Sequence, residues 1–301
     1  MSAWLDLFAG HGVGVAMRNL GIEEYAVEMW QDAIDTRIAN GMSEPVYRDA
    51  WDIELADGLD VDGVWASPPC QTFSAAGSGS GRESLSEILA AVESGGWKSP
   101  RALREFSATL SDPRTGLVIS PLAYVFRLRP RYVVLEQVTP VLPIWESFTR
   151  HLAEMGYSTW TGILDASDYG VPQSRRRAYL IARRDGGVAE APRKQTRANL
   201  DSIRPDQEGL ISNYSSGSGG IVVPGNKKPR GYRRIDQPAF TVTGKVRANR
   251  WYPSMENVTT SEALRMQSYP DDFDVRGDWS LQIGNAVPPR VAEAVLSAFS
   301  G

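Results

Sequence analysis

The chain has 301 residues, of which 42% are hydrophobic and 23% charged, the balance of an ordinary globular protein. Its single cysteine excludes an intrachain disulfide and a Cys-based zinc cluster, and we expect no bound metal. The apolar run Leu117–Phe126 is interrupted and too short to span a membrane, and the N-terminus lacks a targeting pattern. We therefore expect a soluble, cytoplasmic monomer with no membrane partner.

Short apolar runs alternate with helical patterns through the first 184 residues. Buried strands separated by helices indicate an α/β fold with a parallel, doubly wound sheet. The predicted strands are Trp4–Phe8, Tyr25–Glu28, Gly63–Ala66, Tyr132–Leu135 and Ala178–Ala182.

The composition changes after Arg184. Residues 185–256 are rich in Gly, Pro, Ser and Arg, with only weak strands at Ile221–Val223 and Ala239–Thr243. We therefore predict a small separate domain at 185–256, and a larger domain formed by residues 1–184 and 257–301.

Helical order returns towards the C-terminus. Thr259 and Glu262 have the spacing of a capping box, which predicts a helix that begins there. A last helix is predicted to begin near Pro288, because proline suits a first turn and apolar residues then recur every four positions from Val291.

Positive charge is concentrated in residues 226–250. This segment holds eight Lys or Arg and one Asp, a net +7, although the whole chain carries −4. A basic strip on an acidic body is typical of a phosphate-binding surface, and the alternative is a solvated loop. Five of its cations lie close together, namely Lys227, Lys228, Arg230, Arg233 and Arg234.

A glycine-rich loop, Phe8–Gly14, follows the first predicted strand and opens a helix. Glycines let a backbone approach a ligand closely, and a helix N-terminus favours negative groups. Glu28, at the end of the second strand, is placed to bind ribose hydroxyls. The alternative is a tight structural turn beside a surface carboxylate.

Cys70 follows two prolines at the end of a buried strand, where open α/β sheets bind ligands. A lone cysteine is usually a small buried hydrophobe. Prolines constrain the backbone before Cys70, however, and this fixes the direction of its side chain. A thiol held in this way is a candidate nucleophile.

Two further polar groups lie at strand ends. Glu136 ends the strand that begins at Tyr132, and is either a helix cap or a general acid whose pKa is raised by burial. Arg175 and Arg177 precede a strand and would share one face if the extended backbone reaches back to them. They either grip a base carbonyl or phosphate, or form surface salt bridges.

In their order along the chain these motifs resemble the DNA cytosine-5 methyltransferase family. The resemblance covers nearly all of the chain except residues 76–111 and the basic segment. Besides the glycine-rich loop, it rests on Pro68-Pro69-Cys70-Gln71, Glu136-Gln137-Val138, Gln173–Arg177, Thr260–Asp271 and Gln282–Pro289.

The resemblance implies a Rossmann-like, S-adenosylmethionine-dependent methyltransferase sheet, with residues 185–256 as the target-recognition domain. It assigns the cofactor S-adenosyl-L-methionine to Phe8, Gly10, Gly12, Glu28, Met29, Asp49 (with Asp52 as the alternative), Pro68 and Asn285. It assigns catalysis to Cys70, Glu136, Arg175 and Arg177. We also expect DNA contacts from Gln71, Ser74 and Thr241. The density of positive charge predicts further DNA contacts from the basic residues Lys227, Lys228, Arg230, Arg233 and Arg234.

The implied reaction transfers a methyl group to C5 of a cytosine flipped out of double-stranded DNA, through a covalent bond between Cys70 and C6. The implied setting is the cytoplasm of a prokaryotic or phage-infected cell, and a partner restriction endonuclease is left open. One rival is a tRNA cytosine-5 methyltransferase, although its extra Cys-Phe-Thr signature is absent here. Another is a weakly catalytic DNA-binding protein of the same fold.

The chain departs from the family pattern at two places. The family's Glu-Asn-Val is Glu136-Gln137-Val138 here. Cys70 and Glu136 are 66 positions apart, with an insertion around Gly81–Ser111. The resemblance implies that this region forms the mobile loop that closes over DNA.

Overall fold

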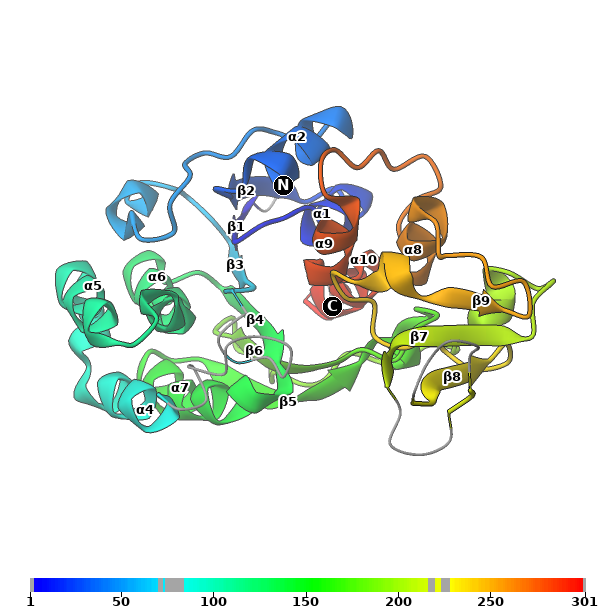
Figure 1. Cartoon of the computed structure of the whole chain (residues 1–301). Coiled ribbons are helices and arrows are strands. Elements are labelled where there is room, and N and C mark those ends of the chain that lie inside the picture. The colour runs from blue at the N-terminus through cyan, green and yellow to red at the C-terminus, as the bar shows by residue number, and fades with distance from the viewer. Residues whose placement is uncertain (1–2, 70–72, 74–83, 216–219, 223–227, 300–301) are drawn as a thin grey trace.

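The computed structural model describes residues 3–69, 73, 84–215, 220–222 and 228–299. Its centre is a six-stranded sheet in the order β2-β1-β3-β4-β6-β5 (Figure 1). The strands are β1 (Ala3–Leu7), β2 (Glu23–Val27), β3 (Gly63–Ala66), β4 (Tyr132–Val138), β5 (Ser158–Asp165) and β6 (Arg176–Arg183).

The central sheet is parallel over four of its strands, as predicted, and differs from the prediction at one edge. Strands β1 to β4 pair in parallel, but β6 is antiparallel to both β4 and β5. The link between β5 and β6 is short and folds back without a crossover helix, so the two strands must run in opposite directions. The sequence analysis missed β5 because this half-buried edge strand lacks a continuous apolar run.

The five predicted strands all exist. Gly63–Ala66 is confirmed as β3, and the others overlap β1, β2, β4 and β6. Strand β2 ends at Val27, so Glu28 lies one residue beyond it. Strand β6 begins at Arg176 rather than Ala178, which carries the extended backbone back through Arg177.

Helices cover both faces of the sheet. One face packs against α4 (Leu85–Ser94), α5 (Pro100–Thr109), α6 (Ser120–Leu128) and α7 (Leu142–Glu154). The other face, which carries Trp4, Trp65 and Ile181, packs against α1 (Gly12–Asn19) and α10 (Pro289–Ser297). Helix α2 (Gln31–Ala39) follows β2. Alternating apolar faces of the strands thus fill two cores, as a doubly covered sheet requires.

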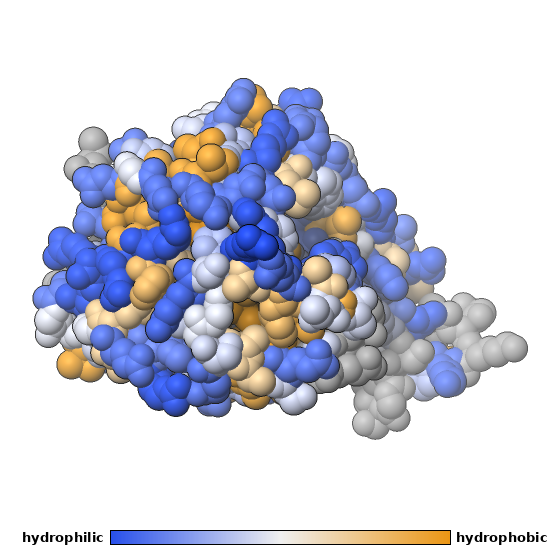
Figure 2. Space-filling view, turned by 90° about the vertical axis from the view of Figure 1, so that its left-hand side faces the viewer, coloured by the Kyte–Doolittle hydropathy of each residue, from blue (hydrophilic) through white to orange (hydrophobic). Residues whose placement is uncertain are grey.

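The insertion is a helical layer over the part of it that the structure describes. Its residues Ile88, Val92, Trp97 and Leu103 are buried in the same core as β3 and β4. The expectation of a mobile loop is therefore wrong for residues 84–111, because they form α4 and α5 and contribute apolar side chains to the core. This side of the molecule faces the viewer in Figure 2, where hydrophilic residues surround separate apolar patches.

A second sheet of three strands lies within residues 185–256, in the order β8-β7-β9. Its strands are β7 (Gly209–Ser215), β8 (Arg230–Arg234) and β9 (Arg250–Tyr252). Leu210 and Trp251 from this sheet share a core with Val15 of α1 and with α8 (Thr260–Met266) and α9 (Trp279–Asn285). The small sheet is therefore packed onto the larger unit.

Of the two weak strands predicted in this segment, Ala239–Thr243 is wrong, and Ile221–Val223 is described only in part. Ile221 forms a single bridge with Arg230, and Ala239 a single bridge with Gln173. Ala239–Thr243 is not a strand of a sheet, because its backbone and side chains bond mainly to residues 172–174, which precede β6. Val223 lies outside the described residues.

The C-terminal helices match the prediction. Thr259 and Glu262 form a capping box at the start of α8. Helix α10 begins at Pro289 and buries Val291 and Val295. No helix in the described part of the chain is long and apolar enough to cross a membrane.

Candidate active site

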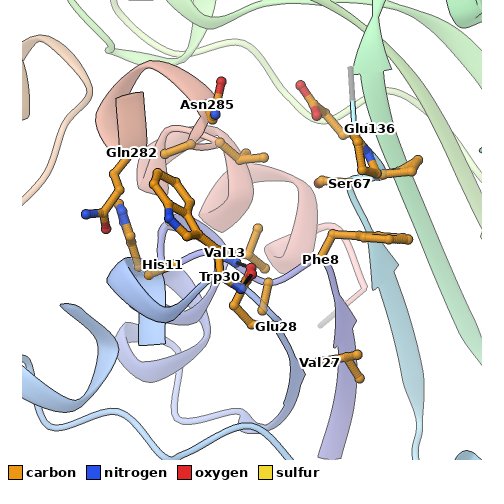
Figure 3. Close-up of a pocket in the computed structure, with 18 of the residues that line it drawn as sticks. Phe8, His11, Val13, Val27, Glu28, Trp30, Ser67, Glu136, Gln282 and Asn285 are labelled. Carbon is orange, nitrogen blue, oxygen red and sulfur yellow. Dashed lines mark hydrogen bonds between the residues drawn. The ribbon is translucent and has the colours of Figure 1, made fainter. Parts of the chain in front are cut away.

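A cavity of about 410 Å³ opens at the carboxyl ends of β1 to β4. The strand order reverses at β1, which lies between β2 and β3, and open α/β sheets bind ligands at such a switch point. The walls come from Phe8–Val13 after β1, Glu28–Trp30 after β2, Ser67–Pro69 after β3, Glu136 and Gln137 of β4, and Gln282–Val287 around the end of α9 (Figure 3).

The glycine-rich loop is shaped by close contacts. Phe8 and Gly10 have positive φ values of 61° and 49°, so the backbone turns sharply directly after β1. A Cβ atom at Gly12 would lie 2.0 Å from the carbonyl oxygen of Val287, so no other residue fits there without a backbone shift. The loop is thus pressed against the segment that follows α9.

Glu28 is fixed by the backbone on both of its carboxylate oxygens. Its Oε2 accepts a hydrogen bond from Gly10 N at 2.8 Å, and its Oε1 accepts one from Trp30 N at 2.7 Å. These bonds hold the carboxylate at the wall of the cavity. The orientation of the Glu28 carboxylate is therefore fixed.

Asp49 also lines the cavity, and its Oδ1 accepts a hydrogen bond from Trp51 N at 2.9 Å. Asp52 is not among the lining residues and lies 3.4 Å from Arg104. Of the two carboxylates that the sequence left open, Asp49 is the one at the cavity. Met29 lines it with a largely exposed side chain, and Asn285 lines it from the end of α9.

The sequence analysis missed several lining residues. Trp30 lies two positions after the strand-end acid Glu28, and an aromatic residue in that position could have been noticed. His11 could not, because its partner Tyr269 is far away in sequence: the His11 Nδ1 atom lies 2.7 Å from the Tyr269 hydroxyl. Burial and the nearby Arg37 lower the pKa of His11 to about 3, so the imidazole is neutral.

Glu136, Arg175 and Arg177 meet on the same cavity wall. Arg177 Nε lies 3.3 Å from Glu136 Oε1. Burial raises the pKa of Glu136 above its ordinary value, while Arg177 and, to a lesser extent, Arg175 lower it. A buried carboxyl group of this kind can hold a proton and donate it.

Arg175 is buried and spans two parts of the chain. Its Nη1 donates to the Val242 carbonyl at 3.0 Å and to the Gly284 carbonyl at 3.1 Å. It therefore joins the 239–243 segment to the end of α9 at the cavity wall.

Cys70 lies outside the described residues, as do Gln71, Ser74 and Lys227. The two prolines before Cys70 line the cavity. Gln137 supports them, because its Nε2 donates to the Pro68 carbonyl while its Oε1 accepts from Val138 N at 2.5 Å. The glutamine that replaces the family's asparagine thus bonds to the segment that leads into Cys70.

The described residues of the basic strip lie away from the cavity lining. Lys228 is exposed, and Arg234 pairs with Asp236 at 2.8 Å. Arg233 lies over the Phe240 ring at 5.0 Å, and Arg230 donates to the Asn213 carbonyl. Thr241, an uncharged residue of the same segment, donates from its hydroxyl to the Ser174 carbonyl at 2.7 Å.

Known proteins match this chain along nearly its whole length. The family model of C-5 cytosine-specific DNA methylases matches residues 3–92, 106–219 and 221–300. The match includes the whole basic segment, residues 226–250, which the resemblance of the motifs does not cover. Type II methyltransferase M1.HphI of Haemophilus parahaemolyticus is 27% identical over 98% of this chain and 86% of its own length. For M.HindV of Haemophilus influenzae the identity is 28%, over 98% of this chain and 95% of its own length.

Among solved structures, a prophage-encoded methyltransferase from E. coli superposes with a TM-score of 0.68 at 20% identity, covering 100% of this chain and 99% of its own. That likeness shows the fold. The family match shows more: this chain belongs to the C-5 cytosine-specific DNA methylases, and its class of reaction is the methylation of cytosine in DNA at C5.

The contacts of Gln137 predict a kinetic effect. Gln137→Leu leaves the Pro68 carbonyl and the Val138 amide without their partner, and kcat for DNA methylation should fall about 5- to 100-fold, the equivalent of losing roughly 1–3 kcal/mol. Steady-state methylation kinetics measure this, with Gln137→Asn as the shorter amide that retains part of the support. An unchanged kcat in Gln137→Leu would show that the Pro68 contact does not support catalysis.

Proposed function

We propose that the chain transfers a methyl group from S-adenosylmethionine to C5 of a cytosine flipped out of a specific duplex DNA sequence, with Cys70 as the covalent nucleophile. The observation that carries this proposal is that one cavity contains both groups of residues. Glu28 and the glycine-rich loop line one part of it, and Glu136, Arg175 and Arg177 line another. A methyl donor and a target base could meet there.

The lining residues fit S-adenosylmethionine. Glu28 keeps lone pairs for ribose hydroxyls after accepting its two backbone bonds, and Asp49 is an acceptor for the adenine amino group. Phe8 and Trp30 offer apolar surface to the adenine ring. The cavity volume of about 410 Å³ lies in the range of small-molecule sites, about 300–1,000 Å³.

The amino-acid end of the cofactor carries a carboxylate, which suits the N-terminus of α1. Among the described residues no side chain caps that helix, and its first N–H groups point to where an anion could bind. Bound in this way, the cofactor supplies the methyl group.

The residues around the base would activate it as follows. The Cys70 thiolate adds to C6, and Glu136 donates a proton or hydrogen bond at N3. The electron pair displaced from the C5–C6 double bond makes C5 nucleophilic, and C5 takes the methyl group. A base then removes the C5 proton, and the Cys70 sulfur leaves as the double bond re-forms. Arg175 and Arg177 would bind the base carbonyl or the adjacent phosphate.

Residues 185–256 would form the target-recognition domain. The three-stranded sheet and the basic strip support this, since Lys228 is exposed and Arg230 and Arg233 are half-buried on β8. Local pairing with Asp236 reduces the charge that Arg234 offers to phosphate. The type II relatives suggest a role in restriction–modification, with an endonuclease that recognises the same sequence.

Covalent trapping tests the nucleophile. Duplex DNA with 5-fluorocytosine at the target position should form a complex with the wild-type chain that survives denaturation, because fluorine blocks removal of the C5 substituent. Cys70→Ser should still bind S-adenosylmethionine but form no complex and methylate nothing. Near-normal turnover in Cys70→Ser would refute the covalent route.

The pH profile tests Glu136 as the proton donor. Activity that needs protonated Glu136 is lost as pH rises through its raised pKa. Arg177→Met removes the main cation that lowers this pKa, so the alkaline limb of kcat/KM should move to higher pH. The maximum should also fall about 10- to 100-fold through loss of a charged contact.

The matched control is Arg176→Met, whose side chain is exposed. It should leave the profile where it is. An alkaline limb that stays fixed in Arg177→Met, or moves to lower pH, would exclude Glu136 as the titrating group.

A further inference from the structure

A buried charge cluster lies beneath the glycine-rich loop, outside the cavity lining. It contains Asp6 of β1, Glu24 of β2 and Arg37 of α2. The Arg37 side chain is 0% exposed, and its Nη2 lies 2.6 Å from Glu24 Oε2. A buried cation needs such a partner, since an unpaired one is costly to remove from water.

The third glycine of the loop makes room for this pair. A Cβ atom at Gly14 would lie 2.8 Å from Glu24 Oε2 and 3.1 Å from Arg37 Nη1. Gly14 therefore lets the ion pair approach the start of α1.

The cluster holds more acid than base. Burial raises the pKa of Asp6 well above its ordinary value, and the neighbouring Glu24 raises it further. The Arg37 cation acts in the opposite direction and lowers the pKa of Asp6. Glu24 lies against the Arg37 guanidinium, so the buried cation keeps a counter-ion within the core.

Arg37 also reaches the loop. Its Nη1 donates to the Gly10 carbonyl at 3.0 Å. The N–H of Gly10 itself donates to Glu28 Oε2 at 2.8 Å. Gly10 has φ of 49°, a conformation that needs outside support in most residues, and here the peptide groups on both sides of its Cα atom are held by side chains.

We propose that Arg37 is a positioning residue for the cofactor: by holding the Gly10 carbonyl it orients the Gly10 N–H that fixes Glu28, and so sets the site for the ribose. The inference rests on the proposed function. Arg37 does not touch the cofactor, and its effect reaches the ribose through Gly10 and Glu28.

A double-mutant cycle tests this route, with calorimetric binding of S-adenosylhomocysteine as the readout. Arg37→Met is combined with Glu24→Gln, so that the cation and its partner are removed together. This pair of changes should weaken binding about tenfold in the wild-type background, the equivalent of roughly 1.4 kcal/mol. In a Glu28→Ala background the same pair should weaken binding less than about twofold, because the group that Arg37 orients is already gone.

Two further variants keep the test decisive. Arg37→Lys retains a buried cation beside Glu24 but lacks the fork that reaches Gly10 as well, and it should also weaken binding, with the melting temperature close to wild type. Arg127 lies on α6 and pairs with Asp57, and neither residue lines the cavity. Arg127→Met breaks this ion pair and should leave binding unchanged. The KM for DNA should be unchanged in all of them.

Equal losses with and without Glu28 would overturn the inference, as would a KM for DNA that rises in parallel. So would Arg37→Lys with wild-type affinity. The proposed function fails separately: in that case the wild-type chain itself does not bind S-adenosylhomocysteine, or Glu28→Ala leaves its affinity unchanged.

Discussion

The contact between Gly12 and Val287 constrains the rest of the site. The Val287 carbonyl oxygen occupies the space where a side chain at residue 12 would begin. This contact presses the start of α1 against the segment between α9 and α10, and Figure 1 shows α1 beside these two helices. Residues from both ends of the chain therefore line one cavity. The His11–Tyr269 hydrogen bond and the packing of α1 on α10 reinforce it.

Two buried polar residues, Arg175 and Gln173, connect other parts of the chain to that cavity. Arg175 bonds to carbonyls of the 239–243 segment and of α9, and Gln173 beside it accepts from Val242 N and donates to the Met266 carbonyl. Residues 173–175, just before β6, are therefore bonded both to the 239–243 segment and to helices α8 and α9. A displacement of the proposed recognition segment would move the Val242 carbonyl that Arg175 binds, and Arg175 lines the same cavity as Glu136.

Local sequence patterns were enough to predict much of the fold and of the candidate site. Apolar runs located five of the six central strands, and capping and proline signals located α8 and α10. Motif order led to the family, and strand-end positions identified Glu28 and Glu136 as site residues that the cavity contains. Asp49 was identified through the resemblance to the family. In each case the feature depends on neighbours in sequence or on a strand terminus.

What could not be predicted depends on distant contacts. The antiparallel β6 follows from the missed edge strand β5, whose half-buried residues carry no clear period. The insertion forms a helical layer because its apolar residues meet β3 and β4, which its own sequence does not reveal. Arg37 looks like an ordinary surface residue of an amphipathic helix until Glu24 and Gly10 are brought beside it.

Hydrogen–deuterium exchange tests most directly whether both ends of the chain build one cofactor site. On addition of S-adenosylhomocysteine, amides in residues 8–14 and in 282–292 should gain protection together and with the same dependence on concentration. Amides of β7, in the small sheet, should not change. Protection confined to one of the two segments, or protection of the two at different concentrations, would contradict the account.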